Sequence, residues 1–195
     1  MKRGWTRFWA SVSLAALGFA GVTAGAPSPR ADPNSLKRNE LRLAALRPGR
    51  DTIARARSLY GNPKSGTKGD TTFSWTTDLR SERLTVTTDA QGLIEEIRAE
   101  RRDDVVIMDG DPLGSPWRTG KNLAIGDLAG RVEKLYGKPD SRSPSTKAGQ
   151  RLELLYYAFD WAGPDVPQVM EVVCTVGKDG QPERVVEITL AASSL

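Results

Sequence analysis

The sequence predicts an α+β protein made of two tandem helix-strand-strand-strand repeats, whose strands form antiparallel sheet with the helices on one face. The pattern Asp-x-x-x-Arg-x-x-x-Leu-Tyr-Gly-x-Pro occurs at residues 51–63 and again at residues 127–139, a constant offset of 76 (127 − 51). Unrelated stretches of this length share roughly one identity on average composition, so six indicate a duplicated unit. Alternating apolar stretches joined by short turns follow each copy, and such strands pair antiparallel.

The first unit is expected over residues 46–101. Asp51 is a suitable N-cap, Gly61 stands where a left-handed C-cap residue belongs, and Pro63 stops the helix between them. Three strands are expected over residues 71–77, 83–88 and 93–99. Residues 89–92 end in glycine and form the turn between the last two strands.

The second unit is expected over residues 122–195. Asp127 and Gly137 repeat the two helix-end signals, and a polar loop follows the helix. Strands are then expected from Leu152 to Trp161, from Met170 to Val176 and around Val186 to Leu190. Cys174 has the phase of the apolar residues in its strand, so we expect a buried thiol.

Residues 1–26 have the three-part layout of a secretory signal peptide. A basic start with Lys2, Arg3 and Arg7 precedes an apolar run at residues 8–22, and small residues follow. We therefore expect a periplasmic or secreted chain without stable membrane insertion after cleavage; the alternative is an uncleaved anchor. Residues 27–45 are expected as a flexible leader, and residues 102–121, rich in Gly and Pro, as a connector.

Composition excludes several classes of function. The 195 residues are 38% hydrophobic and 27% charged, which is ordinary for a globular protein. Residues 2, 3 and 7 supply three of the formal charge of +4, so the rest is too nearly neutral to favour nucleic acid. The chain has no His and one Cys, which removes Ser-His and Cys-His catalysis, the usual zinc ligands and an intramolecular disulfide. No catalytic, cofactor-binding or metal site is therefore predicted.

Two local patterns resemble parts of known binding or catalytic sites. Residues 61–68 have the composition of a phosphate-binding loop, but here the loop follows a helix and leads into a strand, whereas a phosphate-binding loop opens a helix. Glu171 and Glu187 alternate with apolar residues, so we expect both on a solvated sheet face. Neither pattern predicts catalysis.

Residues 126–139, from a Gly and a polar cap through a helix with Val and Leu to Gly-x-Pro, resemble the helix signature of small bacterial envelope domains of the SmpA/OmlA type. The tandem arrangement is similar to that of the β-lactamase inhibitor proteins. The first copy departs from this signature, because Arg50 stands at the position that corresponds to Gly126 in the second copy. The resemblance implies protein binding without catalysis and assigns no binding residues.

The sequence therefore predicts an exported, non-enzymatic module that binds an envelope or secreted protein. The alternatives are an exported hydrolase or small-ligand carrier that uses acids near the connector, such as Asp109 and Asp111, and a structural envelope protein without a specific partner. Binding is expected on the sheet face opposite the helices. In the first unit this face should carry Thr72, Ser74, Thr76, Thr85 and Thr87. In the second it should carry rings from Tyr156, Tyr157, Phe159 or Trp161, unless the connector around Trp117 covers them.

Overall fold

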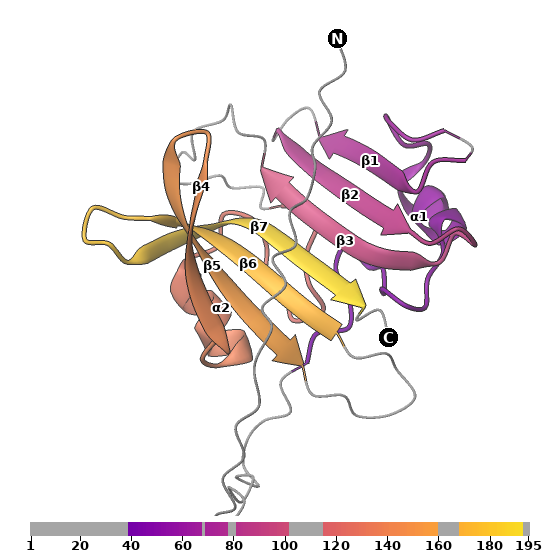
Figure 1. Cartoon of the computed structure of the whole chain (residues 1–195). Coiled ribbons are helices and arrows are strands. Elements are labelled where there is room, and N and C mark those ends of the chain that lie inside the picture. Colours follow the sequence, from indigo (N-terminus) through magenta and orange to yellow (C-terminus); the bar gives the residue numbers. More distant parts are fainter. Residues whose placement is uncertain (1–38, 68, 78–80, 102–114, 160–167, 193–195) are drawn as a thin grey trace, which may run out of the picture. The chain divides into compact units, whose positions relative to one another are not determined.

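Seven strands form one antiparallel sheet with two short helices in the computed structural model, which describes residues 39–67, 69–77, 81–101, 115–159 and 168–192 (Figure 1). The elements are α1 Ile53–Tyr60, β1 Thr72–Thr77, β2 Glu82–Thr88, β3 Ile94–Arg101, α2 Ala129–Tyr136, β4 Ser141–Lys147, β5 Gln150–Phe159, β6 Gln168–Val176 and β7 Pro182–Ala192. The strand order is β1-β2-β3-β7-β6-β5-β4, so β1 and β4 are the edges and the β3–β7 pair joins the two halves.

The predicted α+β fold with tandem helix-strand-strand-strand repeats is wrong, although the antiparallel sheet is confirmed. The described chain is predominantly β: each helix has only eight residues, and all the strands belong to one sheet. Four strands, not three, follow α2. The additional strand is β4, in the segment expected as a polar loop. Its six residues from Ser141 to Thr146 are all exposed, so it carries no apolar alternation and pairs with β5 through its backbone.

The two helices start on the sheet in the same way. The carbonyl of Asp51 accepts the N–H of Ile94 at 2.8 Å, and that of Asp127 accepts the N–H of Val185 at 2.9 Å. Neither Asp caps its helix, since the N-cap residues are Thr52 and Leu128 and neither makes a side-chain cap. The two carboxylates instead accept N–H groups that precede them, from Arg47 at 2.8 Å and from Ala124 at 2.9 Å.

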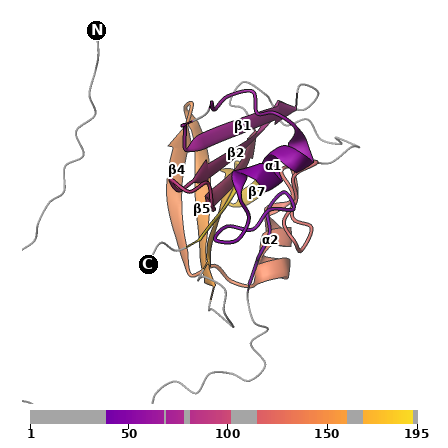
Figure 2. The same ribbon diagram turned by 90° about the vertical axis from the view of Figure 1, so that its right-hand side faces the viewer.

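Each helix ends at a glycine that is bound by an aromatic side chain of the sheet. Gly61 has φ 75° and ψ −161°, and Gly137 has φ 77° and ψ −166°, so φ is positive as expected but ψ is extended. The Trp75 indole donates to the Gly61 carbonyl at 3.0 Å, and the Tyr157 hydroxyl donates to the Gly137 carbonyl at 3.1 Å. Both helices consequently lie on one face of the sheet (Figure 2).

The segment at residues 39–46 lies between the two helices and is bonded to both. The hydroxyl of Tyr60 on α1 donates to the carbonyl of Ala44. The hydroxyl of Tyr136 on α2 donates to the carboxylate of Glu40 at 2.7 Å. Glu40 is 3% exposed, and its carboxylate also accepts three backbone N–H groups, from Leu41, Arg42 and Lys121, at 2.8–3.0 Å. This segment therefore completes the core between the helices and the sheet.

We expect substitution of Gly61 by Ala to lower the free energy of unfolding by about 1–3 kcal/mol, because φ and ψ lie in a region open essentially to glycine. No heavy atom lies within 4 Å of the added Cβ, so the cost is purely one of backbone conformation. The control is Gly130→Ala inside α2, which has equal space and no positive φ, and should stabilise by about 1 kcal/mol. Urea unfolding measures both. Equal effects of the two substitutions would refute the interpretation.

Candidate functional site: the open face of the sheet

The described residues hold no group of three or more Cys, Asp or Glu side chains that is placed to bind a metal ion. Cys174 is buried as predicted, and burial, reinforced by the Glu153 charge, raises the pKa of its thiol to about 12. The thiol of Cys174 is therefore neither accessible nor ionised at neutral pH. Asp109 and Asp111, the acids of the hydrolase or carrier alternative, lie outside the described residues.

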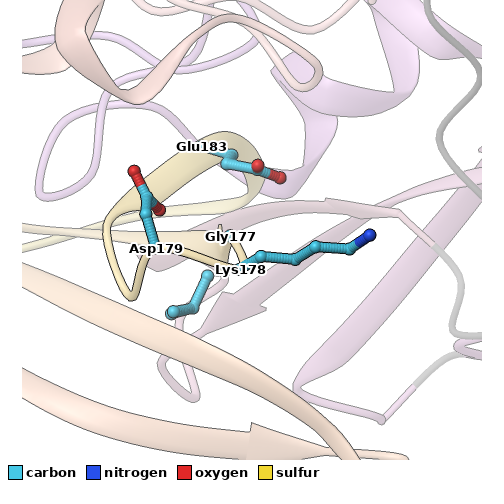
Figure 3. A pocket seen from close by; sticks show the side chains of 5 residues that line it. Gly177, Lys178, Asp179 and Glu183 are labelled. Carbon is cyan, nitrogen blue, oxygen red and sulfur yellow. The ribbon is translucent and has the colours of Figure 1, made fainter.

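A hollow of about 420 Å³ lies at the β6–β7 turn, lined by Val176, Gly177, Lys178, Asp179 and Glu183 (Figure 3). A Cβ on Gly177 would stand 2.5 Å from a carboxylate oxygen of Glu183, which is the end of an exposed side chain. Asp179 accepts the N–H of Gln181 at 3.0 Å and thereby closes the turn. In Figure 3 Lys178 extends away from both carboxylates. The arrangement is that of a tight turn and contains no further group that points to a ligand.

The two faces of the sheet differ in what covers them. Alternate residues of the central strands, such as Ile97, Ile188 and Met170, are fully buried beneath the helices. The intervening residues point to the other face, which no described helix covers. We call this second surface the open face. It has three zones: a polar zone on β1 and β2, a charged zone on β3 and β7, and an apolar zone on β5 and β6.

The polar zone contains the hydroxyl side chains that were expected there. Thr72 is exposed, and four others are partly exposed: Ser74, Thr76, Thr85 and Thr87. Registers place Thr85 opposite Ser74 and Thr87 opposite Thr72 on the two strands. The zone is thus a continuous strip of hydroxyl groups beside one edge of the sheet.

The charged zone centres on Glu100 and Glu187, which face each other across the β3–β7 pair. Lys147 Nζ lies 2.9 Å from Glu100 Oε2 and 3.6 Å from Glu187 Oε2. Arg98 Nε lies 3.6 Å from Glu187, and Arg83 Nη1 lies 3.4 Å from Glu100. Each carboxylate therefore meets two cations.

The contact of Lys147 shows how strongly the sheet curls. Lys147 is the last residue of β4, and three strands (β5, β6 and β7) separate β4 from β3 in the sheet order. It can reach Glu100 only because the β4–β5 hairpin turns across the open face, as its steep crossing of β7 in Figure 1 illustrates. A side chain of the β4 edge thus contacts the central β3–β7 pair of the sheet.

The electrostatics of Glu187 reflect this enclosure. Partial burial raises the pKa of its carboxyl, the charges of Arg98 and Lys147 lower it, and the charge of Glu100 raises it. Burial is the largest of these effects, so the net shift is upward.

The apolar zone carries one of the four expected rings. Tyr156 and Leu154 are partly exposed on β5, and Val169 and Val173 are partly exposed on β6. Leu154 lies opposite Val173, whereas Tyr156 lies opposite Glu171, so one carboxylate lies within this zone. The strand is apolar on both sides, which is why sequence alone did not separate its two faces.

Two of the other rings that the sequence proposed for this face lie elsewhere. Tyr157 and Phe159 belong to the core beneath α2, where their ring centroids lie 5.9 and 6.1 Å from that of Tyr136. Trp161 lies outside the described residues. Trp117 is 3% exposed and packs in the same core cluster as Tyr157. Its ring is therefore part of the core and does not cover the open face.

Comparisons with known proteins give no identification. No protein-family model matches the chain, and no curated protein matches it. A DUF4309 family protein from Bacillus subtilis is similar with a TM-score of 0.43 and 13% identity, over 76% of this chain and 82% of that one. A cysteine-rich secretory protein from Staphylococcus aureus has a TM-score of 0.36 and 10% identity, over 73% of this chain and 44% of that one. Both TM-scores are too low to show a shared fold or function.

We expect the Glu187 carboxyl to titrate above the ordinary value of 4.5, measured by the pH dependence of its NMR carbon shift. Lys147→Met should raise this midpoint further, because it removes a neighbouring cation. Glu100→Gln should lower it, because it removes a neighbouring anion.

The same shift has a consequence for stability. A raised folded-state pKa means that the native state holds this proton more tightly than the unfolded chain does. The stabilisation is therefore complete below pH 4.5 and is lost as the pH rises through the folded-state pKa. Midpoint shifts of the same sign in Lys147→Met and Glu100→Gln would contradict the assignment of the charged zone.

Proposed function

We propose that the chain is an exported, non-enzymatic module that binds an envelope or secreted protein through the open face of its sheet. The observation that carries the proposal is the chemistry of that face. Partly exposed apolar side chains of β5 and β6, including Tyr156, share this face with charged groups on β3 and β7 and with a strip of hydroxyls on β1 and β2. Apolar side chains bordered by charged and polar groups are a usual composition of a protein interface.

The engagement of the carboxylates supports binding over hydrolysis. A general acid or base must be free to exchange a proton with a substrate. Glu100 and Glu187 are instead bonded to Lys147 and flanked by arginines, an arrangement suited to holding strands together. The chain also contains no His to serve as a base. Charged groups fixed in this way favour recognition of a partner by orientation and register.

Export is supported by the basic start, apolar run and small-residue exit of residues 1–26. We expect the mature chain to begin near residues 25–27 and to be found outside the cytoplasm. N-terminal sequencing of the chain recovered from culture medium and envelope fractions measures this. Recovery of intact Met1 in the membrane fraction would instead identify an uncleaved anchor.

We expect Tyr156→Ala with Leu154→Ser to abolish capture of the partner from envelope extract, because both substitutions remove apolar area from the apolar zone of the open face. Loss of an anchoring aromatic ring typically costs about 2 kcal/mol or more, which is roughly a thirtyfold loss of affinity. Binding should then be remeasured with the purified partner by calorimetry.

The matched control for this experiment is Leu128→Ser, which also removes an exposed leucine but lies at the start of α2. The control should retain the partner, and circular dichroism should show that both variants are folded. A partner captured equally by the open-face variant and the unchanged chain would refute the proposal.

A further inference from the structure

Charge is distributed unequally between the helix layer and the sheet. The helix layer comprises residues 40–64 and 115–140, that is, the helices and the segments around them. It contains eleven Lys and Arg against five Asp and Glu, a formal charge of +6 (11 − 5). The sheet is taken as the strands with their short turns, residues 72–77, 82–101, 141–159 and 168–192. It contains eight Lys and Arg against ten Asp and Glu, a formal charge of −2 (8 − 10). The net charge of the chain beyond its N-terminal segment is close to zero, but the helix layer by itself is basic.

Several of these basic side chains are exposed to solvent and take part in no ion pair with the described residues. Arg42, Arg55 and Lys134 are exposed and make no ion pair with any described residue. On α1, Ala56 faces the core, so Arg55 lies on the outer side. On α2, Val132 and Tyr136 face the core in the same way, which directs Lys134 outward. Arg55 and Lys134 thus point away from the sheet.

The exposed large apolar side chains lie on the same layer. Among the described residues these are three leucines: Leu41 at 37%, Leu59 at 37% and Leu128 at 59% exposure. Leu59 follows Arg55 by one helical turn, Leu41 adjoins Arg42, and Leu128 immediately precedes α2. Leu59 and Leu41 are therefore close to an exposed basic residue, whereas the backbone of Leu128 pairs with that of Arg184 on β7.

The leucines and cations share one side of the molecule. Residues 39–46 lie between α1 and α2, bonded to α1 through Tyr60 and Ala44 and to α2 through Tyr136 and Glu40. Figure 2 shows both helices and this segment on one face of the sheet. The open face, with its charged and apolar zones, lies on the opposite side.

We propose that the outer surface of the helix layer binds peripherally to an anionic lipid membrane. Arginine and lysine attract the headgroups, while leucines enter the boundary between headgroups and acyl chains. A nucleic acid would engage the cations but offers no acyl boundary for the leucines, so the pairing of the two residue types favours lipid. This surface is independent of the partner-binding open face and would leave that face directed away from the bilayer.

Contact of this kind is shallow. The structure contains no helix, within the residues it describes, that is long and apolar enough to cross a membrane. Short helices with exposed leucines can lie in the interface plane, and the attraction depends on anionic lipid and on salt. The association is therefore reversible, and its strength follows the number of cations at the surface.

The test uses the full chain and vesicles of phosphatidylcholine with or without phosphatidylglycerol. Leu128→Cys is labelled with an environment-sensitive fluorophore, and Ser143→Cys on exposed β4 is the position-matched control. The native Cys174 is fully buried and escapes labelling. The apolar run at residues 8–22 contributes equally to both proteins, so the local label reports contact at its own position.

We expect a blue shift of the label at residue 128 with anionic vesicles only, lost at high salt, and no shift at residue 143. Arg42→Gln with Arg55→Gln should weaken this binding about fivefold for each residue. The charge-matched control, Arg151→Gln with Lys178→Gln on the sheet side, should leave it unchanged.

Three results would overturn the proposal. The first is a label at residue 128 that stays in water with anionic vesicles, whether or not the chain sediments with them. The second is an equal blue shift with neutral vesicles. The third is equal weakening by the two charge-matched pairs, which would reduce the effect to net charge. Capture of an acidic protein by the helix layer, with no vesicle response, would assign this surface to a protein instead.

Discussion

The helix layer depends on the hydrogen bonds that the buried carboxylate of Glu40 accepts. A buried charge is costly unless hydrogen bonds replace its hydration, and here three backbone N–H groups and the Tyr136 hydroxyl do so. The donors come from the segment before α1, from the loop at residue 121 and from α2. Displacement of any one would leave the charge underbonded. Gly120 is required beside it, because an added Cβ would stand 2.5 Å from the carboxylate.

This fixed layer explains how a chain with little helix keeps two chemically different surfaces. The helices are too short to be stable alone, so their positions derive from bonds to the sheet and to the segment between them. Aromatic side chains make several of these bonds: Trp75 and Tyr157 hold the helix ends, and Tyr60 holds the segment. With the core occupied in this way, basic and apolar side chains of the helices remain outside, and the reverse of the sheet remains uncovered by them.

Sequence patterns predicted those parts of the fold that local chemistry determines. Positive-φ glycines and apolar alternation located both helix ends and most strands, because each signal reflects a constraint within a few residues. The β4 strand was missed, since an exposed edge strand pairs by backbone bonds that impose no side-chain pattern. Asp51 and Asp127 have the right chemistry to cap a helix, but their carboxylates bond to earlier N–H groups. The predicted fold class was wrong because each helix has only eight residues and all seven strands join one sheet, so the described chain is predominantly β.

The open face could be predicted only in outline, because its charged zone is created by the curl of the sheet. Lys147 and Glu100 are 47 residues apart and lie on strands that do not pair, so no local pattern relates them. The basic character of the helix layer could not be predicted for a different reason. The net charge of the chain sums the charges of surfaces that face opposite directions. The two surfaces share no described side chain, and well-separated sites usually contribute additively. Loss of lipid contact should therefore leave the intrinsic affinity of the open face unchanged, while altering where in the cell that face is presented.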